Sequence, residues 1–398
     1  MEIKIHTHIT DIREVWDALQ APSIFLSSKY LSAVEQHPPS DMKFRYAVFY
    51  EDGIPMGKAY FQVLHFDGEK SLSPDKEEAF CSVLSVVKRG LKQLIAYRIQ
   101  LRTLVSGNLL TSGIPTYFFI NKSPELELQY LDQCICNIIS DSIDQKEDIP
   151  MIILKDIRAD HANHVKSTSN GVAPQFYPFT IQPVMMMDMM DSWNSFEDYI
   201  QSLSSKYRVR TRRALKLKEG ITKVELDLAS MEKWKERMTM LFRDVVDNAK
   251  FNMVDIDIEY FFALKRIFPQ AFKIHGYFIE DEMVGFYTTI MDDRQLVAHF
   301  LGYDVSLNKS HKLYLNILYD IIDDAISIKA HTIDFARTAT EIKSSIGAYS
   351  VDYPCFIRHR KNFTNQFIPR LVNYFNPTEE WTPRNPFKSK NVTSKPIV

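Results

Sequence analysis

The sequence has little glycine, little cysteine and no long apolar run. Its 398 residues include 12 glycines, which argues against linker-dominated or collagen-like chains. The 4 cysteines are too few for a disulfide framework, and Cys134-x-Cys136 lacks the second Cys or His pair of a zinc site. We therefore expect reduced thiols and no metal site. The net charge of -2 argues against a chain that binds nucleic acid through its overall charge.

Signals for export and membrane insertion are also missing. The N-terminal segment MEIKIHTHITDIREVWDAL has no apolar signal-peptide core. No stretch reaches the roughly 18 apolar residues that a membrane-spanning helix needs. We expect a cytoplasmic protein that is not integral to a membrane, with peripheral contact left open.

What is present is typical of a globular protein, with 45% apolar residues, 25% charged residues, 26 Phe and 19 Tyr. Apolar periodicity predicts a first half with helices at 11–19, 76–97 and 124–143, a β-hairpin within 41–66, and strands at 102–110, 151–157 and 179–189. It predicts a second half with helices at 195–218, 231–250, 257–268, 311–330 and 362–375, three strands within 271–304, and strands at 222–228, 332–337 and 355–360. Antiparallel strands that lead into a helix and then a parallel strand indicate an α/β or α+β sandwich.

The segment SSKYRVRTRRALKLKEG, residues 204–220, is strongly basic and has no acid between Lys206 and Lys218. On one continuous helix, three of its cations lie opposite the apolar side and form a solvated ridge: Arg208, Arg212 and Lys216. Arg210 instead falls within the apolar arc, where an unpaired charge is costly. We therefore expect Arg210 to be buried beside a core carboxylate or a ligand anion.

Polar residues follow the strand predicted at 332–337. The segment FARTATEIKSSIGAY holds Arg337, Glu341 and Lys343 at the end of this strand, where the ligand clefts of α/β sheets lie. Glu341 is a candidate general base, and Arg337 or Lys343 could hold an anion or a developing oxyanion. An exposed loop that caps the sheet is the alternative interpretation.

A second loop lies between the strand that ends at Asp304 and the helix that starts near His311. It holds Asn308, Lys309 and Ser310, and the N–H groups of the following helix could bind phosphate. No glycine-rich loop is present here, so a plain helix N-cap by Ser310 is the competing interpretation.

The order of these elements resembles that of the GNAT-fold transferases, and more closely the Fem-type branch with two GNAT-like domains in tandem. SSKYRVRTRRALK is similar to the K-x-R-x-x-x-R-R-A helix that opens the second domain of that branch. Residues 302–348 resemble its segment of strand, loop, long helix, strand and K-x-x-x-G motif, here Lys343 to Gly347. LVSGNLLTSG, residues 104–113, is similar to a Gly-Asn segment in the first domain of bacterial peptidoglycan biosynthesis/recognition homologues.

The resemblance implies a mixed α+β fold with two tandem GNAT-like domains at 1–185 and 186–375, and a flexible tail at 376–398. It implies transfer of an acyl or aminoacyl group from acyl-coenzyme A or aminoacyl-tRNA to an amine, such as a cell-wall or lipid precursor. SLNKS stands where the coenzyme-A branch has a Q/R-x-x-G-x-G/A pyrophosphate loop. The coiled-coil arm of the tRNA branch is not visible either.

The resemblance also implies roles for individual residues. Four candidates would serve the chemistry and the acceptor: Glu341 as base, Tyr303 as the acid for the leaving group, and Arg337 and Lys343 as acceptor-site residues. Four more would hold donor phosphate: Arg210, Asn308, Lys309 and Ser310.

Two other functions stay open. A non-catalytic GNAT-like pair could recognise a cell-wall precursor or a partner protein, and the missing glycine-rich loop favours this. The basic segment alone suggests a nucleic-acid binder, but its aromatic residues are predicted to face the core. We expect no DNA partner, and tRNA only as a donor.

Overall fold

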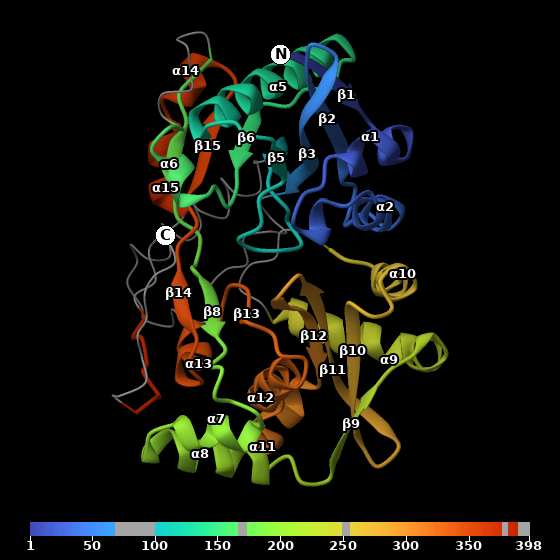
Figure 1. Cartoon of the computed structure of the whole chain (residues 1–398), viewed down its shortest axis with the longest axis vertical. Helices are drawn as coiled ribbons and strands as arrows, with labels where there is room; N and C mark the ends of the chain where they lie inside the picture. The colour runs from blue at the N-terminus through green and yellow to red at the C-terminus, as the bar shows by residue number, and fades with distance from the viewer. Residues whose placement is uncertain (68–99, 166–172, 249–254, 376–380, 389–398) are drawn as a thin grey trace, which may run out of the picture.

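A computed structural model describes residues 1–67, 100–165, 173–248, 255–375 and 381–388. Figure 1 shows two β-sheets, one above the other along the longest axis, with helices packed around them. No described helix is long and apolar enough to cross a membrane. The helix predicted at 76–97 lies outside the described residues.

The first sheet has eight strands in the order β1-β2-β3-β4-β6-β15-β7, with β5 paired to β3. They are β1 (Glu2–His6), β2 (Lys43–Glu51), β3 (Ile54–Asp67), β4 (Gln100–Ser106), β5 (Tyr117–Phe119), β6 (Met151–Leu154), β7 (Tyr177–Phe179) and β15 (Cys355–His359). The accompanying helices are η1 (Ile9–Ile12), α1 (Arg13–Ala18), η2 (Ile24–Leu26), α2 (Ser28–Gln36), α5 (Pro124–Asp144), α6 (Ala159–Ala162), α14 (Asn362–Asn365) and α15 (Ile368–Phe375). The predicted hairpin is confirmed, because β2 and β3 are joined by Asp52 (φ 51°) and Gly53 (φ 79°), a left-handed pair that these residue types favour.

The second sheet has seven strands in the order β14-β8-β13-β12-β11-β10-β9. They are β8 (Val184–Asp188), β9 (Ile221–Glu225), β10 (Phe272–Ile279), β11 (Glu282–Asp292), β12 (Gln295–Tyr303), β13 (Thr332–Asp334) and β14 (Tyr349–Val351). Its helices are α7 (Phe196–Ser202), α8 (Ser205–Lys216), α9 (Leu228–Asp247), α10 (Glu259–Ile267), η3 (Val305–Leu307), α11 (Asn308–His311), α12 (Leu313–Ser327) and α13 (Thr340–Ser345).

Each sheet contains one parallel strand pair. β4 runs parallel to β6, and β12 runs parallel to β13. The β12–β13 pairing covers only Gln295–Val297 and Thr332–Asp334, and beyond it His299 and Phe300 form a bulge opposite Thr288. Because the carboxyl ends of parallel strands share an edge, each pair places two loops near each other.

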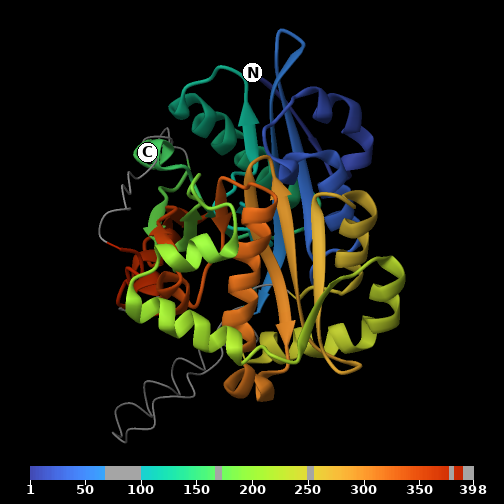
Figure 2. The ribbon, with the colours of Figure 1, turned by 60° about the horizontal axis from the view of Figure 1, so that its bottom comes forward.

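The two sheets share a buried core. One apolar cluster joins side chains of α2, such as Tyr30, to side chains of α9 and α10, such as Phe242 and Phe261. Helices α2 and α10 pack against each other, blue against gold in Figures 1 and 2. Apolar burial that continues from one half to the other stabilises a single arrangement of the two sheets.

The predicted helix that carries the basic segment is broken in two. Leu203 and Ser204 have ψ angles of 147° and 156°, which are extended, so α7 and α8 are separate helices. The break changes the rotational phase of α8, whose buried residues are Thr211 and Ala214. Arg210 is therefore exposed, and the prediction that it lies in the apolar core is wrong.

The C-terminal part of the chain does not stay with one sheet. Strand β14 lies at the edge of the second sheet, but β15 crosses to the first sheet and pairs with β6 and β7. β8 already belongs to the second sheet although it begins at Val184. The sheets therefore do not divide the chain at a single point, and the domain limits stay a prediction.

Residues 381–388 pack against the second half, whereas we expected them to belong to a flexible tail. The ring of Phe387 lies 5.9 Å from the ring of Trp193, measured between centroids. The Ser204 N–H donates to the Pro386 carbonyl at 2.8 Å. We call residues 381–388 the C-terminal strap.

Candidate functional site

Two loops from different sheets meet at the carboxyl ends of parallel strands. The first follows β6 and begins with Lys155 and Asp156. The second follows β13, contains Arg337 and leads into α13, which carries Lys343. Asp156 forms an ion pair with Arg337, so the two strand ends are joined directly. We call Lys155, Asp156, Asp334, Arg337 and Lys343 the junction cluster.

Asp156 is the anionic centre of the junction cluster. Its side chain is 1% exposed, pairs with Lys155 and Arg337, and accepts from the Gly113 N–H at 2.9 Å. Burial by itself would raise the pKa of this carboxyl. The charges of Lys155 and Arg337, with the hydrogen bonds from Lys155 and Gly113, hold that pKa below its ordinary value. Asp156 is thus a stable buried anion.

Lys343 is a buried amine that faces few compensating groups. It is 4% exposed, and its Nζ donates to the Arg337 carbonyl at 2.6 Å. Burial lowers the pKa of Lys343 to about 7, although Asp334 acts in the opposite direction. Burial also raises the pKa of Asp334 to about 6, against a 2.6 Å hydrogen bond from the Ala336 N–H. An amine with a pKa near 7 takes both protonation states at neutral pH, as an acid–base group requires.

The backbone that connects β13 to α13 is strained. Ala336, Thr338 and Ala339 have φ angles of 57°, 68° and 48°, in the left-handed region that side-chain-bearing residues avoid. Such strain costs on the order of 1–3 kcal/mol per residue and is concentrated at sites where the chain must aim a side chain. Here it accompanies the turn that brings Arg337 to Asp156.

The loop after β4 closes the junction cluster on a third side. Lys155 Nζ donates to the carbonyls of Asn108 and Thr111 at 3.0 and 2.9 Å. Among the described residues, the buried polar atoms of this region without a hydrogen-bond partner include Ser106 Oγ, Thr111 Oγ1 and Arg337 Nε. Buried polar atoms are normally satisfied by protein, water or ligand. The site therefore has unused hydrogen-bonding capacity beside its charged groups.

The structure brings Arg337 and Lys343 together but places Glu341 elsewhere. Glu341 is exposed at the start of α13, where it accepts from the Thr382 N–H at 3.4 Å and pairs with Arg384 at 3.3 Å. Both partners belong to the C-terminal strap. Glu341 anchors that segment, and its role as a general base stays a prediction.

Tyr303 and the residues of α11 form a separate group at the start of α12. The Tyr303 ring lies 6.1 Å from the ring of Tyr314, whose backbone N–H donates to Asn308 Oδ1 at 3.1 Å. Lys312, with a left-handed φ of 51°, separates α11 from α12, so Ser310 lies inside α11. Lys312 occupies the N-cap position of α12, and Asn308 Oδ1 accepts from the first turn of that helix, so the N-cap interpretation of Ser310 is wrong.

These residues already make contacts within their own segment, and their role in holding the pyrophosphate of coenzyme A stays a prediction. Asn308 Oδ1 is occupied by the Tyr314 N–H, and Ser310 Oγ donates to the Leu307 carbonyl at 3.0 Å. Lys309 is exposed and offers one flexible charge without the backbone donors of a glycine-rich loop. Within the described part of the chain, no three His, Cys, Asp or Glu side chains are placed to hold a metal ion.

Lys155, Asp156 and Asp334 belong to the junction cluster but were not among the residues predicted from the sequence. Lys155 and Asp156 directly follow the apolar run MIIL, which is the signal that pointed to Arg337 after the later strand. Asp334 interrupts the apolar strand TIDF, and a carboxylate inside a buried strand is itself unusual. The sequence thus marks both positions as unusual, but it does not show that Asp156 pairs with Arg337 or that Asp334 lies near Lys343.

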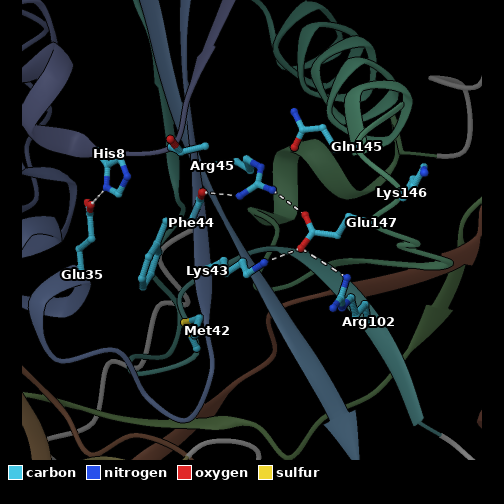
Figure 3. Close-up of a pocket in the computed structure, with 11 residues that line it drawn as sticks. His8, Glu35, Met42, Lys43, Phe44, Arg45, Arg102, Gln145, Lys146 and Glu147 are labelled. Atoms are coloured by element: carbon cyan, nitrogen blue, oxygen red, sulfur yellow. Dashed lines mark hydrogen bonds and ion pairs between the residues drawn. The ribbon is translucent and has the colours of Figure 1, made fainter. Parts of the chain in front are cut away.

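A hollow of about 560 Å³ lies at the opposite end of β4 and β6, shown in Figure 3. Arg102, near the start of β4, and Glu147, ahead of β6, line it. Because β4 and β6 are parallel, their starts lie at the edge opposite to Lys155 and Asp156. The hollow is therefore distinct from the junction cluster.

Comparison with known proteins shows the fold. No protein-family model matches the chain, and no curated protein sequence matches it. Among solved structures, FemX is similar over 94% of this chain and 100% of its own, with 12% sequence identity and a TM-score of 0.51. The chain has the FemX fold. The predicted class, two GNAT-like units with mixed sheets and flanking helices, is confirmed.

Two further structures are less similar. A tandem GNAT protein from the clavulanic acid biosynthesis pathway covers 90% of this chain and 99% of its own, at 7% identity and a TM-score of 0.47. A conserved protein of unknown function from Bacteroides thetaiotaomicron covers 90% of this chain and 100% of its own, at 10% identity and a TM-score of 0.49. The fold assignment rests on FemX, and identity this low shows the fold without the substrate.

Proposed function

We propose that this protein transfers an acyl or aminoacyl group from a carrier to an amine, with the junction cluster as its reaction site. The observation that supports this most is Lys343, a buried amine with a pKa of about 7 at the end of a parallel strand pair. The FemX fold agrees with the transferase activity that the Fem-type resemblance implies. The carrier, whether coenzyme A or tRNA, and the acceptor stay open.

The reaction needs little covalent help from the protein. The amine nitrogen attacks the carbonyl carbon of the donor, a C–N bond forms, and the C–O or C–S bond to the carrier breaks. The amine must lose a proton and the leaving atom must gain one. Neutral Lys343 can accept the first proton and, as an ammonium, return it to the leaving oxygen or sulfur. Glu341 and Tyr303 are the alternative base and acid.

Fixed positive charge is the second requirement. Oxygen of the donor carbonyl becomes negative as the bond to nitrogen forms, and nearby cations stabilise it. Arg337, whose side chain is 11% exposed and whose Nε has no partner among the described residues, supplies such a charge in an enclosed setting. Lys155, whose side chain is 9% exposed, adds positive charge nearby, although its own donors are used by Asn108, Thr111 and Asp156. The strength of both charges there exceeds that in water because little solvent screens them. Asp156 keeps both cations in place.

The test compares Lys343→Met with Lys58→Met, which is a matched control. Lys58, on β3, is also buried at 2% exposure, donates to the Trp16 carbonyl at 2.9 Å and has a pKa lowered to about 8 by burial. Each variant is assayed with acyl-coenzyme A and aminoacyl-tRNA donors and with amine acceptors of the cell-wall precursor type. We expect Lys343→Met to lose roughly 100-fold or more in kcat, as a lost acid–base group does, and Lys58→Met to retain the rate.

Thermal unfolding of both variants separates catalysis from folding. Met replaces the buried amine with an apolar chain of similar length, so we expect Lys343→Met to melt no lower than the wild type. Full transfer activity in Lys343→Met would remove the junction cluster from the reaction. A wild-type protein that is stabilised by an acceptor but transfers nothing would support the alternative, a non-catalytic recognition protein.

A further inference from the structure

The hollow of Figure 3 is lined by more cations than anions. Four cationic side chains face two carboxylates: Lys43, Arg45, Arg102 and Lys146 against Glu35 and Glu147. Three of the cations converge on Glu147, with nitrogen–oxygen distances of 2.7, 2.8 and 3.4 Å for Lys43, Arg45 and Arg102. One carboxylate against three cations leaves an excess positive charge. The pKa of Glu147 lies below its ordinary value, mainly through its hydrogen bond from Lys43.

Glu35 offsets part of this excess, but its oxygens bond to their own surroundings, and the four cations of the lining still outnumber the two carboxylates. It accepts from the Ile9 N–H and from the Tyr46 hydroxyl, both at 3.0 Å, and lies 2.6 Å from His8 Nδ1. These contacts fix one wall of the hollow. The other wall carries the excess charge, as Figure 3 shows for the side chains that point toward Glu147.

The cations of the hollow differ in how firmly they are held. Arg45 is mostly buried, with its side chain 11% exposed, and it also donates to the Phe44 carbonyl at 2.9 Å. Arg102 and Lys43 are 44% and 60% exposed, so their outer donors face the solvent-filled space. Lys146 is exposed beside them. One buried cation with more exposed cationic partners around a space of about 560 Å³ suits a small charged ligand.

We propose that this hollow binds a small multivalent anion of the phosphate or pyrophosphate type. Glu147 orients the cations in the absence of ligand, and an anion with two or more charges adds the negative charge that Glu147 alone does not provide. Arg102 presents a planar fork that matches two oxygens of such a group, while Lys43 and Lys146 act as point charges. The four-residue strand β6, roughly 13 Å long, lies between Glu147 at the hollow and Lys155 at the junction cluster, so the two sites are separate and this proposal does not rest on the transfer reaction.

Calorimetric binding of inorganic pyrophosphate to the full chain, at constant ionic strength, tests the proposal. Arg102→Gln and Lys146→Gln should each weaken binding roughly tenfold, because each removes a charged hydrogen-bond donor. Glu147→Gln should tighten binding several-fold, since it removes the competing anion. Lys216→Gln, at an exposed cation on α8, is the matched control and should leave binding unchanged.

Three outcomes would overturn the proposal. They are no binding of pyrophosphate in the millimolar range, binding that Arg102→Gln and Lys146→Gln leave intact, and weakening of the same size in Lys216→Gln. If Glu147→Gln does not fold, the two variants at exposed side chains decide alone. Orthophosphate in a parallel titration should bind more weakly than pyrophosphate, as charge-driven binding requires.

Discussion

Asp156 of the first half and Arg337 of the second half form a buried ion pair that joins the carboxyl ends of β6 and β13. The two residues are 181 positions apart in the chain. The same arginine offers its carbonyl to Lys343 at 2.6 Å. Arg337 therefore links the ion pair between the halves to the proposed acid–base group. A substitution that moves Arg337 should also move the hydrogen-bond partner of Lys343.

Loss of this ion pair should destabilise the fold. Asp156→Asn leaves Arg337 and Lys155 buried without their anion, and breaking a buried pair in this way costs about 3–5 kcal/mol. Urea denaturation measures the change in the free energy of unfolding. The exposed pair between Arg212 and Glu197, at 2.7 Å with both side chains 56% exposed, is the control. Glu197→Gln should change stability little, and an equal effect of both variants would contradict the argument.

Lys343 should make stability increase with pH above neutrality. Its pKa is about 7 in the folded protein and 10.5 as the ordinary value for an unfolded chain. Between these two pH values the unfolded chain binds more protons, so the free energy of unfolding rises with pH. The melting temperature of the wild type should therefore rise relative to that of Lys343→Met from pH 7 upward.

Asp334 should act in the opposite direction at lower pH. Its pKa is about 6 in the folded protein against an ordinary 3.8, so the folded state binds more protons between these values. Stability therefore falls as the pH rises from about 4 to about 6. The melting temperature of the wild type relative to Asp334→Asn should fall through this window. If the melting-temperature difference between the wild type and each variant does not change with pH, neither Lys343 nor Asp334 has the shifted pKa described above.

Gly347 should not tolerate a side chain while the C-terminal strap is in place. Its φ is +112°, and a Cβ there would lie 2.4 Å from the ring of Phe387. Gly347→Ala thus meets both backbone strain and a clash, together roughly 2–4 kcal/mol. Phe387→Ala removes the clash but not the strain, so the double variant should lose less than the sum of the two single losses. If chemical denaturation shows that the double variant loses the full sum of the two single losses in stability, Gly347 and Phe387 are not in contact.

Gly302 should be needed for β12 to approach α9. A Cβ at Gly302 would lie 2.7 Å from the Phe242 nitrogen and 2.8 Å from the Leu241 carbonyl carbon, and backbone atoms do not move as a side-chain end does. We expect Gly302→Ala to cost about 1–3 kcal/mol. Gly285 on the neighbouring strand is the control, because its nearest atom would be 3.3 Å away. Gly285→Ala should cost clearly less in the same thermal unfolding experiment.

Local patterns in the sequence were sufficient for most elements. The residues Asp52 and Gly53 specify a left-handed turn, and the hairpin forms around them. The helical spacing of apolar residues predicted a helix at 124–143, and α5 spans Pro124–Asp144 with Ser123 as its cap. These features depend on neighbours along the chain, so they are visible in the sequence.

The break between α7 and α8 could not be predicted in this way. Leu203 and Ser204 are not helix breakers, and the extended conformation is matched by distant partners. The Ser204 N–H donates to the Pro386 carbonyl at 2.8 Å, and the Lys388 N–H donates to the Ser202 carbonyl at 3.2 Å. The C-terminal strap thus replaces the hydrogen bonds that a continuous helix would make. The phase of α8, and with it the exposure of Arg210, follows from this tertiary contact.

By itself the sequence determined the order of the elements, the tandem fold that this order resembles, and the polar residues after buried strands, Arg337 and Lys343 among them. Only the tertiary structure decided that Asp156 meets Arg337 and that Lys343 is buried while Glu341 is exposed. The physical reason is that element type depends on local spacing. Burial, ion pairing and pKa depend instead on contacts between segments that are far apart in the chain.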